Sequence, residues 1–232
     1  MIRLQSLTHG YSTQPVLNQL DMVLERGEKL VISGRSGVGK TTLVRLIAGL
    51  DVADSGSVEI DGVNMHNGSL LVAPHERAIT VVFQRPALWQ HMKVSAHLEF
   101  VAPGTRRQKE STVREILQAS GLESLRDRRP YQLSEGQARR VAIARAIAAQ
   151  ANYMLMDEPL VNLDQESKTD LLKLIESHVT ATGMGLLFVT HDDSEAELLG
   201  GTRLWLRQGR LWPTPVVDRC CESVAGPAVA TA

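Results

Sequence analysis

One segment constrains the fold of this 232-residue chain more than any other, namely the sequence GRSGVGKT from Gly34 to Thr41. It matches the pattern G-x-x-x-x-G-K-[ST], follows a short apolar run, and precedes leucines at helical spacing. Glycines let the backbone curl so that successive N–H groups face phosphate oxygens, and the following helix adds its positive end. The segment therefore predicts a strand–loop–helix unit that binds the phosphates of a nucleotide.

Side chains at the end of this segment add further phosphate chemistry. The Lys40 ammonium can reach the β- and γ-phosphates, and the Thr41 hydroxyl can ligate Mg²⁺. The predicted nucleotide contacts in this segment and directly after it are Gly34, Ser36, Gly37, Gly39, Lys40, Thr41 and Thr42.

A second motif supplies the acidic groups that such a site needs. The apolar run from Tyr153 to Met156 predicts a strand, and Asp157 and Glu158 follow it directly. From this position Asp157 would hold Mg²⁺ through water, and Glu158 would polarise the attacking water as a general base. Together the two motifs predict a Mg²⁺-dependent nucleoside triphosphatase.

The order of strand and helix patterns along the chain predicts an α/β fold. Strand patterns occur at residues 2–9, 16–24, 29–33, 58–60, 79–83, 153–156 and 186–190. Helical spacing of apolar residues separates several of these strands, which favours a parallel sheet. From residue 86 to about 150 the pattern is helical and basic, and this predicts a helical lobe inserted into the α/β core. We expect the small-residue tail after Trp212 to be poorly ordered.

Composition excludes several classes of protein. The net charge is −1 and only nine residues are aromatic, which argues against nucleic-acid binding by bulk charge or base stacking. A disulfide between the adjacent Cys220 and Cys221 would be strained, so a reducing compartment is favoured. No apolar run approaches the ~18 residues that cross a bilayer, and polar residues interrupt any signal peptide. We therefore expect a cytoplasmic chain with no nucleic-acid partner.

A third motif, Leu133-Ser134-Glu135-Gly136-Gln137, lies between the first two and precedes a basic and apolar helix. It resembles the signature sequence of ATP-binding cassette (ABC) proteins, whose usual form is LSGGQ. Further landmarks occur in the order typical of that family. They resemble the Q-loop glutamine (Gln84), the D-loop (Asn162-Leu163-Asp164), the switch histidine (His191) and the aromatic residue that contacts adenine (Tyr11).

The resemblance covers residues 1–212 and implies an ABC ATPase domain that uses ATP and Mg²⁺. It implies a P-loop core over residues 1–85 and 151–212, which contains a parallel sheet and an N-terminal antiparallel β subdomain. It also implies a helical lobe over residues 86–150 and a flexible tail over residues 213–232. The implied catalytic residues are Lys40, Gln84, Glu158 and His191, and the implied metal-site residues are Thr41, Gln84 and Asp157. Further implied nucleotide contacts are Tyr11, Ser134, Gly136, Gln137 and Asp164.

The signature segment also has the features of a second anion-binding site. Ser134 and Gln137 have the spacing of a capping box, which predicts a helix N-terminus with free N–H groups. In the family, two cassettes pair head to tail around two ATP molecules, so this site would serve the nucleotide of a second subunit. Glu135 replaces the usual glycine, and Val161 begins the D-loop where a small polar residue is common. We expect activity to persist because a carboxylate is favourable at a helix N-terminus.

The resemblance implies the peripheral ATPase subunit of an ABC transporter, on the cytoplasmic face of the membrane. The segment from Gln84 to Val94 resembles that of bacterial importers, where a groove receives a permease helix. The expected function is thus ATP-driven solute uptake through a separate permease, with a solute-binding protein as a further candidate partner. An exporter or lipid-extraction system is the alternative. A chromosome factor is disfavoured because the chain has no long coiled-coil insertion, and a translation factor because it has only one P-loop. The intact catalytic residues argue against a scaffold that binds the nucleotide without hydrolysing it.

Overall fold

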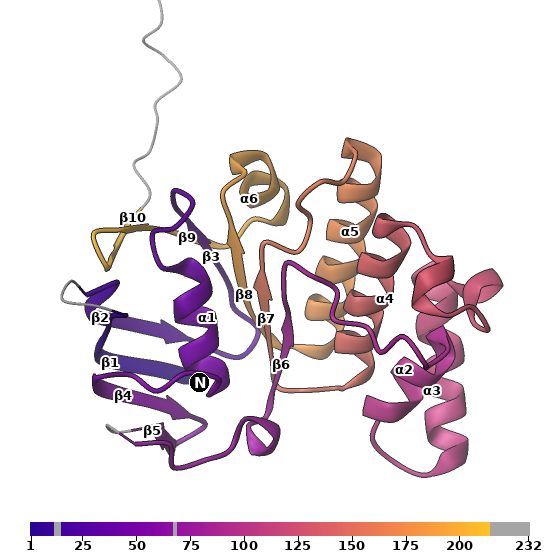
Figure 1. Cartoon of the computed structure of the whole chain (residues 1–232), viewed down its shortest axis with the longest axis horizontal. Helices are drawn as coiled ribbons and strands as arrows, with labels where there is room; N and C mark the ends of the chain where they lie inside the picture. The colour runs from indigo at the N-terminus through magenta and orange to yellow at the C-terminus, as the bar shows by residue number, and fades with distance from the viewer. Residues whose placement is uncertain (12–14, 67–68, 214–232) are drawn as a thin grey trace, which may run out of the picture.

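The structure, a computed structural model, describes residues 1–11, 15–66 and 69–213. Two β-sheets and a set of helices form successive layers (Figure 1). One sheet has four strands and the other has six. Helix α1 (Lys40–Ala48) lies between them, and the remaining helices lie on the far side of the larger sheet.

The smaller sheet is antiparallel and has the order β2-β1-β4-β5. Its strands are β1 (Ile2–His9), β2 (Leu17–Leu24), β4 (Ser55–Ile60) and β5 (Val63–His66). In β2, Leu20, Met22 and Leu24 are buried and the residues between them are exposed, as expected for a strand with one face on the core. The antiparallel β subdomain that the sequence predicts is therefore confirmed.

The larger sheet has the order β10-β9-β3-β8-β7-β6. Its strands are β3 (Lys29–Ser33), β6 (Ile79–Val82), β7 (Tyr153–Asp157), β8 (Gly185–Thr190), β9 (Thr202–Arg207) and β10 (Arg210–Pro213). Neighbouring strands from β6 to β9 are parallel, and β9 and β10 form an antiparallel hairpin. Strands β7 and β8 are buried along their whole length because layers cover both faces. The predicted parallel sheet is confirmed.

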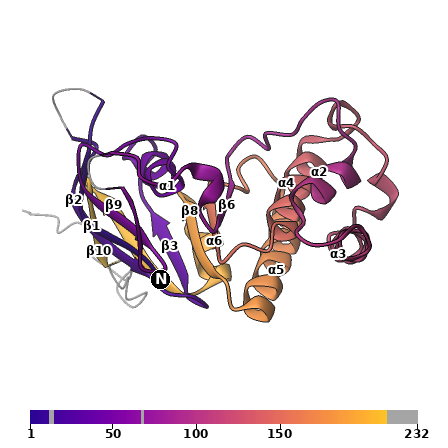
Figure 2. The same ribbon diagram turned by 90° about the horizontal axis from the view of Figure 1, so that it is seen from below.

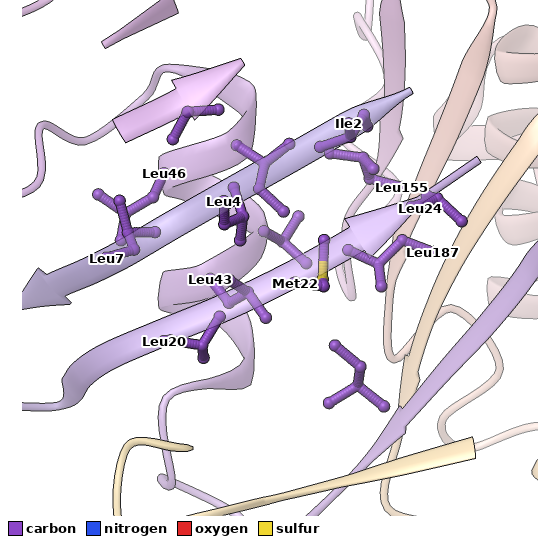
Figure 3. Close-up of a cluster of buried hydrophobic side chains, with 14 of the residues drawn as sticks. Ile2, Leu4, Leu7, Leu20, Met22, Leu24, Leu43, Leu46, Leu155 and Leu187 are labelled. Atoms are coloured by element: carbon purple, nitrogen blue, oxygen red, sulfur yellow. The ribbon is translucent and has the colours of Figure 1, made fainter. Parts of the chain in front are cut away.

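Two apolar clusters hold the layers together. The first joins the antiparallel sheet, α1 and one face of the parallel sheet, and its members include Leu4, Leu43, Leu155 and Leu187 (Figure 3). The second packs the other face against α4 (Glu135–Ala148), α5 (Gln165–Thr182) and α6 (Asp193–Leu199). The loop that precedes α1 is therefore fixed to both sheets through the buried side chains of that helix.

The helical lobe has a small core of its own. It consists of α2 (Val94–Val101), α3 (Arg106–Ala119) and part of α4, with short 3₁₀ turns at Glu123–Leu125 and Pro130–Gln132; a third lies at Pro74–Glu76, outside the lobe. Figure 2 shows α2 and α3 at the opposite end of the molecule from β1, β2 and β10. Together with the two sheets, this arrangement confirms the predicted fold class.

Some elements differ from the sequence-based expectations. Strand β5, helix α6 and the hairpin of β9 and β10 were not predicted. Pro213, which the sequence analysis places in the tail, is the last residue of β10. Residues 214–232, including Cys220 and Cys221, lie outside the described residues. None of the helices in the described ranges is long and apolar enough to cross a membrane.

Candidate functional site

The glycine-rich loop runs from the end of β3 to the start of α1, as its sequence predicts. Gly37 and Gly39 have φ angles of +78° and +112°, which L-residues with side chains rarely adopt. A Cβ at Gly39 would lie 2.7 Å from Cγ1 of Val16, so that position is also too crowded for a side chain. Helix α1 has no side-chain cap and no acidic residue in its first turn. Its N-terminal N–H groups and positive dipole end are thus suited to an anion.

Lys40 is held by its own loop. Its side chain is buried, and Nζ donates hydrogen bonds to the carbonyl oxygens of Gly34 (2.8 Å) and Arg35 (3.1 Å). The same Nζ lies 3.1 Å from Oε1 of Glu158. The loop and the end of β7 therefore meet at an ion pair between the buried Lys40 and the partly buried Glu158, and the two motifs found in the sequence form one site.

The side of α1 that faces residues 9–11 carries the predicted adenine contact. The Tyr11 hydroxyl lies 3.4 Å from the Thr42 hydroxyl and donates a hydrogen bond to Asp51 (3.3 Å). Its ring packs edge-on against the His9 ring, with 4.9 Å between the ring centroids, and is otherwise largely exposed. Tyr11 thus offers an aromatic surface next to the loop, while Ser36 of the loop and Thr41 in the first turn of α1 are exposed.

Asp157 ends β7 and is buried next to the loop. Burial raises the pKa of Asp157 above its ordinary range, and the charge of Glu158 raises it further, whereas a hydrogen bond from Thr41 and the charge of Lys40 lower it. Its Oδ1 atom is buried and has no hydrogen-bond partner among the described residues. A buried carboxylate oxygen beside a hydroxyl group fits a hard divalent cation.

The described residues contain no cluster of three or more His, Cys, Asp or Glu side chains that could enclose a metal ion by themselves. Mg²⁺ is commonly held by one or two protein oxygens together with phosphate oxygens and water. Asp157 and Thr41 are the groups that would hold it.

Glu158 stands between two other predicted catalytic residues. Its Oε1 contacts Lys40, and its Oε2 lies 3.3 Å from Nδ1 of His191. Its backbone has a φ of +47°, an uncommon conformation for a residue with a side chain, and its N–H donates to the carbonyl of Val189 in β8. Strain of this kind often accompanies functional residues.

His191 follows β8, and an ion-pair network supports the turn behind it. Lys168 of α5 lies 2.7 Å from both Asp192 and Glu195, and the Thr190 hydroxyl donates to Glu195 (2.6 Å). Sequence reasoning missed Lys168, because its partners lie more than 20 positions away and local spacing does not reveal them. The network ties the turn that carries His191 to α5.

Gln84 is placed at the edge of this group. It follows β6, whose neighbour in the sheet is β7, so both strands end on the same side. Its carbonyl accepts a hydrogen bond from Arg139 of α4 (2.9 Å), but within the described residues its exposed side chain makes no hydrogen bond. The structure therefore brings Gln84 to the contact between sheet and lobe without joining its side chain to Asp157 or Thr41.

The signature segment begins α4, as predicted. Ser134 is the N-cap, its Oγ accepts from the N–H of Gln137 (3.2 Å), and the Gln137 side chain accepts from the N–H of Ser134 (3.1 Å). This confirms the capping box. Among the described residues, no hydrogen bond or ion pair joins Ser134, Gly136 or Gln137 to the phosphate loop of the same chain.

The D-loop lies beside the signature segment. A Cβ at Gly136 would be 3.4 Å from Cδ2 of Leu163, and Asp164 is the N-cap of α5. The Asp164 carboxylate accepts hydrogen bonds from the N–H (2.9 Å) and the hydroxyl (2.7 Å) of Ser167, which lower the pKa of Asp164. In the structure this side chain caps its own helix.

A family model described as "ABC transporter" matches residues 17–161. This chain belongs to the ABC transporter family. Two curated members of the family are similar over almost the whole chain. The spermidine/putrescine import ATP-binding protein PotA of Haemophilus influenzae is 37% identical over 217 residues, which cover 91% of this chain and 56% of that protein. The Fe(3+) ions import ATP-binding protein FbpC of Serratia marcescens is 35% identical over 215 residues, which cover 90% of this chain and 61% of that protein.

The chain thus spans 56% to 61% of the length of these two ABC family relatives. A solved cassette from the family resembles the fold closely. The dimeric post-hydrolysis state of the ATP-binding cassette MJ0796, bound to ADP and Pi, superposes with a TM-score of 0.80 at 27% identity. The match covers 91% of this chain and 96% of that chain.

Proposed function

We propose that this chain is the ATP-hydrolysing subunit of an ABC transporter that drives solute uptake through a separate permease. The observation that carries the proposal is the contact of Glu158 with both Lys40 and His191, at the carboxyl ends of adjacent parallel strands. A base, a phosphate-binding cation and a histidine are thus gathered beside a loop shaped for phosphate. Family membership supports the same activity.

In this proposal the phosphates of ATP bind to the N–H groups of the loop from Gly34 to Thr41, and the Tyr11 ring contacts adenine. The Lys40 ammonium, already directed into the loop, neutralises charge on the β- and γ-phosphates. Mg²⁺, when bound at Asp157 and Thr41, would polarise the phosphate oxygens as a Lewis acid. Glu158 accepts a proton from the attacking water, and His191 orients the Glu158 carboxylate. Gln84, at the contact between the sheet and the lobe, would link the presence of the γ-phosphate to the position of the lobe.

The proposed assembly contains two copies of the chain. Because no hydrogen bond or ion pair in the described part of the chain joins Ser134, Gly136 or Gln137 to their own phosphate loop, we assign them, with Asp164, to the nucleotide of a second copy. The dimeric ADP-bound cassette of similar fold supports this arrangement. The proposed domain comprises residues 1–212 with the lobe at 86–150.

The two relatives are named for import of polyamines and of ferric ions, which supports uptake over export. They differ in the transported solute, so the substrate of this chain would be chosen by its permease and by any solute-binding protein. We place the chain on the cytoplasmic face of the membrane, where a permease would hold it.

The activity is tested by measuring phosphate release from ATP with and without Mg²⁺. The wild type should hydrolyse ATP only with Mg²⁺, and Lys40→Met should abolish hydrolysis and weaken ATP binding by at least tenfold. Lys173→Met, which removes an exposed lysine of α5, is the matched control and should behave as wild type. Mg²⁺-independent or absent hydrolysis by the folded wild type would refute the proposed activity.

The transport role needs a separate experiment. The chain, tagged in its native cells and cross-linked, should copurify with a membrane-spanning permease subunit. Deletion of its gene should abolish ATP-dependent uptake of the solute that the complex carries, and Lys40→Met should fail to restore that uptake. Recovery without any membrane protein, or efflux in place of uptake, would contradict the import assignment.

A further inference from the structure

One guanidinium group joins three segments of the site. Arg139 lies in the second turn of α4, and only 5% of its surface is exposed. Its Nη1 donates to the carbonyl oxygens of Gln84 (2.9 Å) and Pro159 (3.1 Å), and its Nη2 donates to Oε1 of Glu135 (2.9 Å). A planar group with several fixed N–H donors can hold such separate partners at once, whereas an ammonium group is a single point charge.

Each of these partners belongs to a different part of the ATP site. Gln84 follows β6, Pro159 follows the proposed base Glu158 directly, and Glu135 is the first residue of α4 after its N-cap. Arg139 therefore connects the lobe to both core segments that end beside the phosphate loop. A movement of α4 must either carry Gln84 and Pro159 with it or break these hydrogen bonds.

The contact with Glu135 has a second effect. At the first position of α4, a free carboxylate would be attracted to the N–H groups at the helix N-terminus. Arg139 instead holds the carboxylate one turn further along the helix as an i,i+4 ion pair. The N-terminal N–H groups of α4 are thereby kept available for another anion.

We propose that Arg139 is a positioning residue of the ATP site, which holds the Glu135 carboxylate away from the phosphate-facing end of α4 and fixes the segments of Gln84 and Glu158 to the lobe. This inference rests on the proposed function, because the anion in question is the γ-phosphate bound to a second copy. Glu135 and Arg139 then act as a pair. The Glu135 carboxylate leaves the N-terminal N–H groups of α4 available to the phosphate only while Arg139 holds it.

The neighbouring arginine provides a control. Arg140 lies on the same helix, but its Nη1 contacts the carbonyl of Ser120 (3.4 Å) within the lobe. Arg140→Gln therefore removes the same charge and keeps all contacts of Arg139 with Gln84, Pro159 and Glu135. It should leave kcat and KM for ATP within about twofold of wild type.

The test is a double-mutant cycle on the full chain, with kcat, KM for ATP and the thermal midpoint measured for each variant. Arg139→Gln should raise KM at least fivefold when Glu135 is present and less than twofold when it is combined with Glu135→Gly. It should lower kcat at least fivefold in both backgrounds, because the links to Gln84 and Pro159 are lost in both. Arg139→Lys keeps the charge beside Glu135 but cannot join all three partners, so it should restore KM and leave kcat low.

Several outcomes would overturn the inference. An equal KM change in both backgrounds would show that Arg139 does not control Glu135, and a wild-type kcat in Arg139→Gln would show that the bridge has no role in turnover. If Arg139→Gln unfolds, Arg139→Lys decides, since a wild-type kcat in that variant would refute the bridge to Gln84 and Pro159, and a raised KM would refute the control of Glu135. Failure of the wild type to hydrolyse ATP would instead refute the proposed function and is recognised before any variant is made.

Discussion

Oε2 of Glu158 lies 3.3 Å from Nδ1 of His191. The two residues come from the ends of β7 and β8, and the backbone N–H of Glu158 is bonded to Val189, two positions before the histidine. The sheet register therefore sets the distance between the proposed base and the group that orients it. The other oxygen of the carboxylate faces Lys40, so both of its oxygens are in contact with other side chains.

Replacement of Glu158 by glutamine should separate ATP binding from hydrolysis. The amide has the same shape but cannot accept the proton of the attacking water, and general-base catalysis contributes about 10²- to 10⁴-fold. We expect phosphate release to fall at least 100-fold, while a fluorescent ATP analogue binds within a few-fold of wild type and the dimer becomes stable enough to isolate.

Glu123→Gln, which changes an exposed carboxylate in the lobe, is the control for that measurement. It should keep the wild-type rate. Hydrolysis by Glu158→Gln at the rate of this control would exclude Glu158 as the base.

Removal of Lys168 should destabilise the protein strongly. Its ammonium lies 2.7 Å from Glu195, whose side chain is only 4% exposed, and the carboxylate would be left buried without its cation. Breaking a buried pair in this way costs about 3–5 kcal/mol. Urea unfolding of Lys168→Met should show a loss of this size, and Lys173→Met on the exposed side of α5 should lose less than about 0.5 kcal/mol. A loss below 1 kcal/mol in Lys168→Met would mean that the network contributes little.

The same network predicts a pH dependence. The hydrogen bond from Lys168, followed by that from Ser194, lowers the pKa of Asp192 from its ordinary value of 3.8 to about 2. A lowered pKa in the folded state means that the stabilisation is complete above about pH 4 and is lost as the pH falls towards 2. The side chain is 30% exposed, so this contribution is of the order of 1–2 kcal/mol.

Urea unfolding at pH values between 5 and 2 tests this effect. Asp192→Asn should be less stable than wild type at pH 5, and the difference should shrink towards pH 2. Asp170→Asn on α5 serves as the control and should follow the wild-type curve. A constant difference between Asp192→Asn and wild type across the range would contradict the prediction.

The two glycines of the phosphate loop should respond differently to a methyl group. Both have positive φ, which costs an alanine about 1–2 kcal/mol. At Gly39 the Cβ would also lie 2.7 Å from Val16, whereas at Gly37, apart from the adjacent residues of the chain, no atom of the described residues would lie within 4 Å of the Cβ. Gly39→Ala should therefore lose clearly more thermal stability than Gly37→Ala, as differential scanning fluorimetry would show. Equal losses would indicate that Val16 moves aside freely.

Much of the core could be predicted because its pattern is local. The apolar residues of β2, the glycines before α1 and the acids after β7 each reveal their structure within a few residues. The Ser134–Gln137 capping box is of the same kind, since both partners lie within one helical turn. For the same reason, the Glu135–Arg139 ion pair could have been predicted from its i,i+4 spacing.

The remaining features depend on contacts between distant parts of the sequence. Strand β9 pairs with β3, so Leu30 and Thr202 become neighbours although 172 positions separate them. Arg139 reaches Gln84 across 55 positions and Pro159 across 20. Neither contact produces a periodic pattern in the sequence. Each is made by a single side chain or strand edge, and the packing of the layers determines which residue becomes its partner.

The position of α1 between the two sheets has a mechanical consequence. A helix enclosed on both sides cannot shift without disturbing two packed interfaces at once, so the end of the molecule that carries the phosphate loop behaves as a rigid frame. The lobe of α2 and α3 has a separate small core and rests on the frame mainly through α4. In any rearrangement driven by the nucleotide, the lobe would therefore rotate relative to a stationary loop. A protein bound to the lobe would move with it.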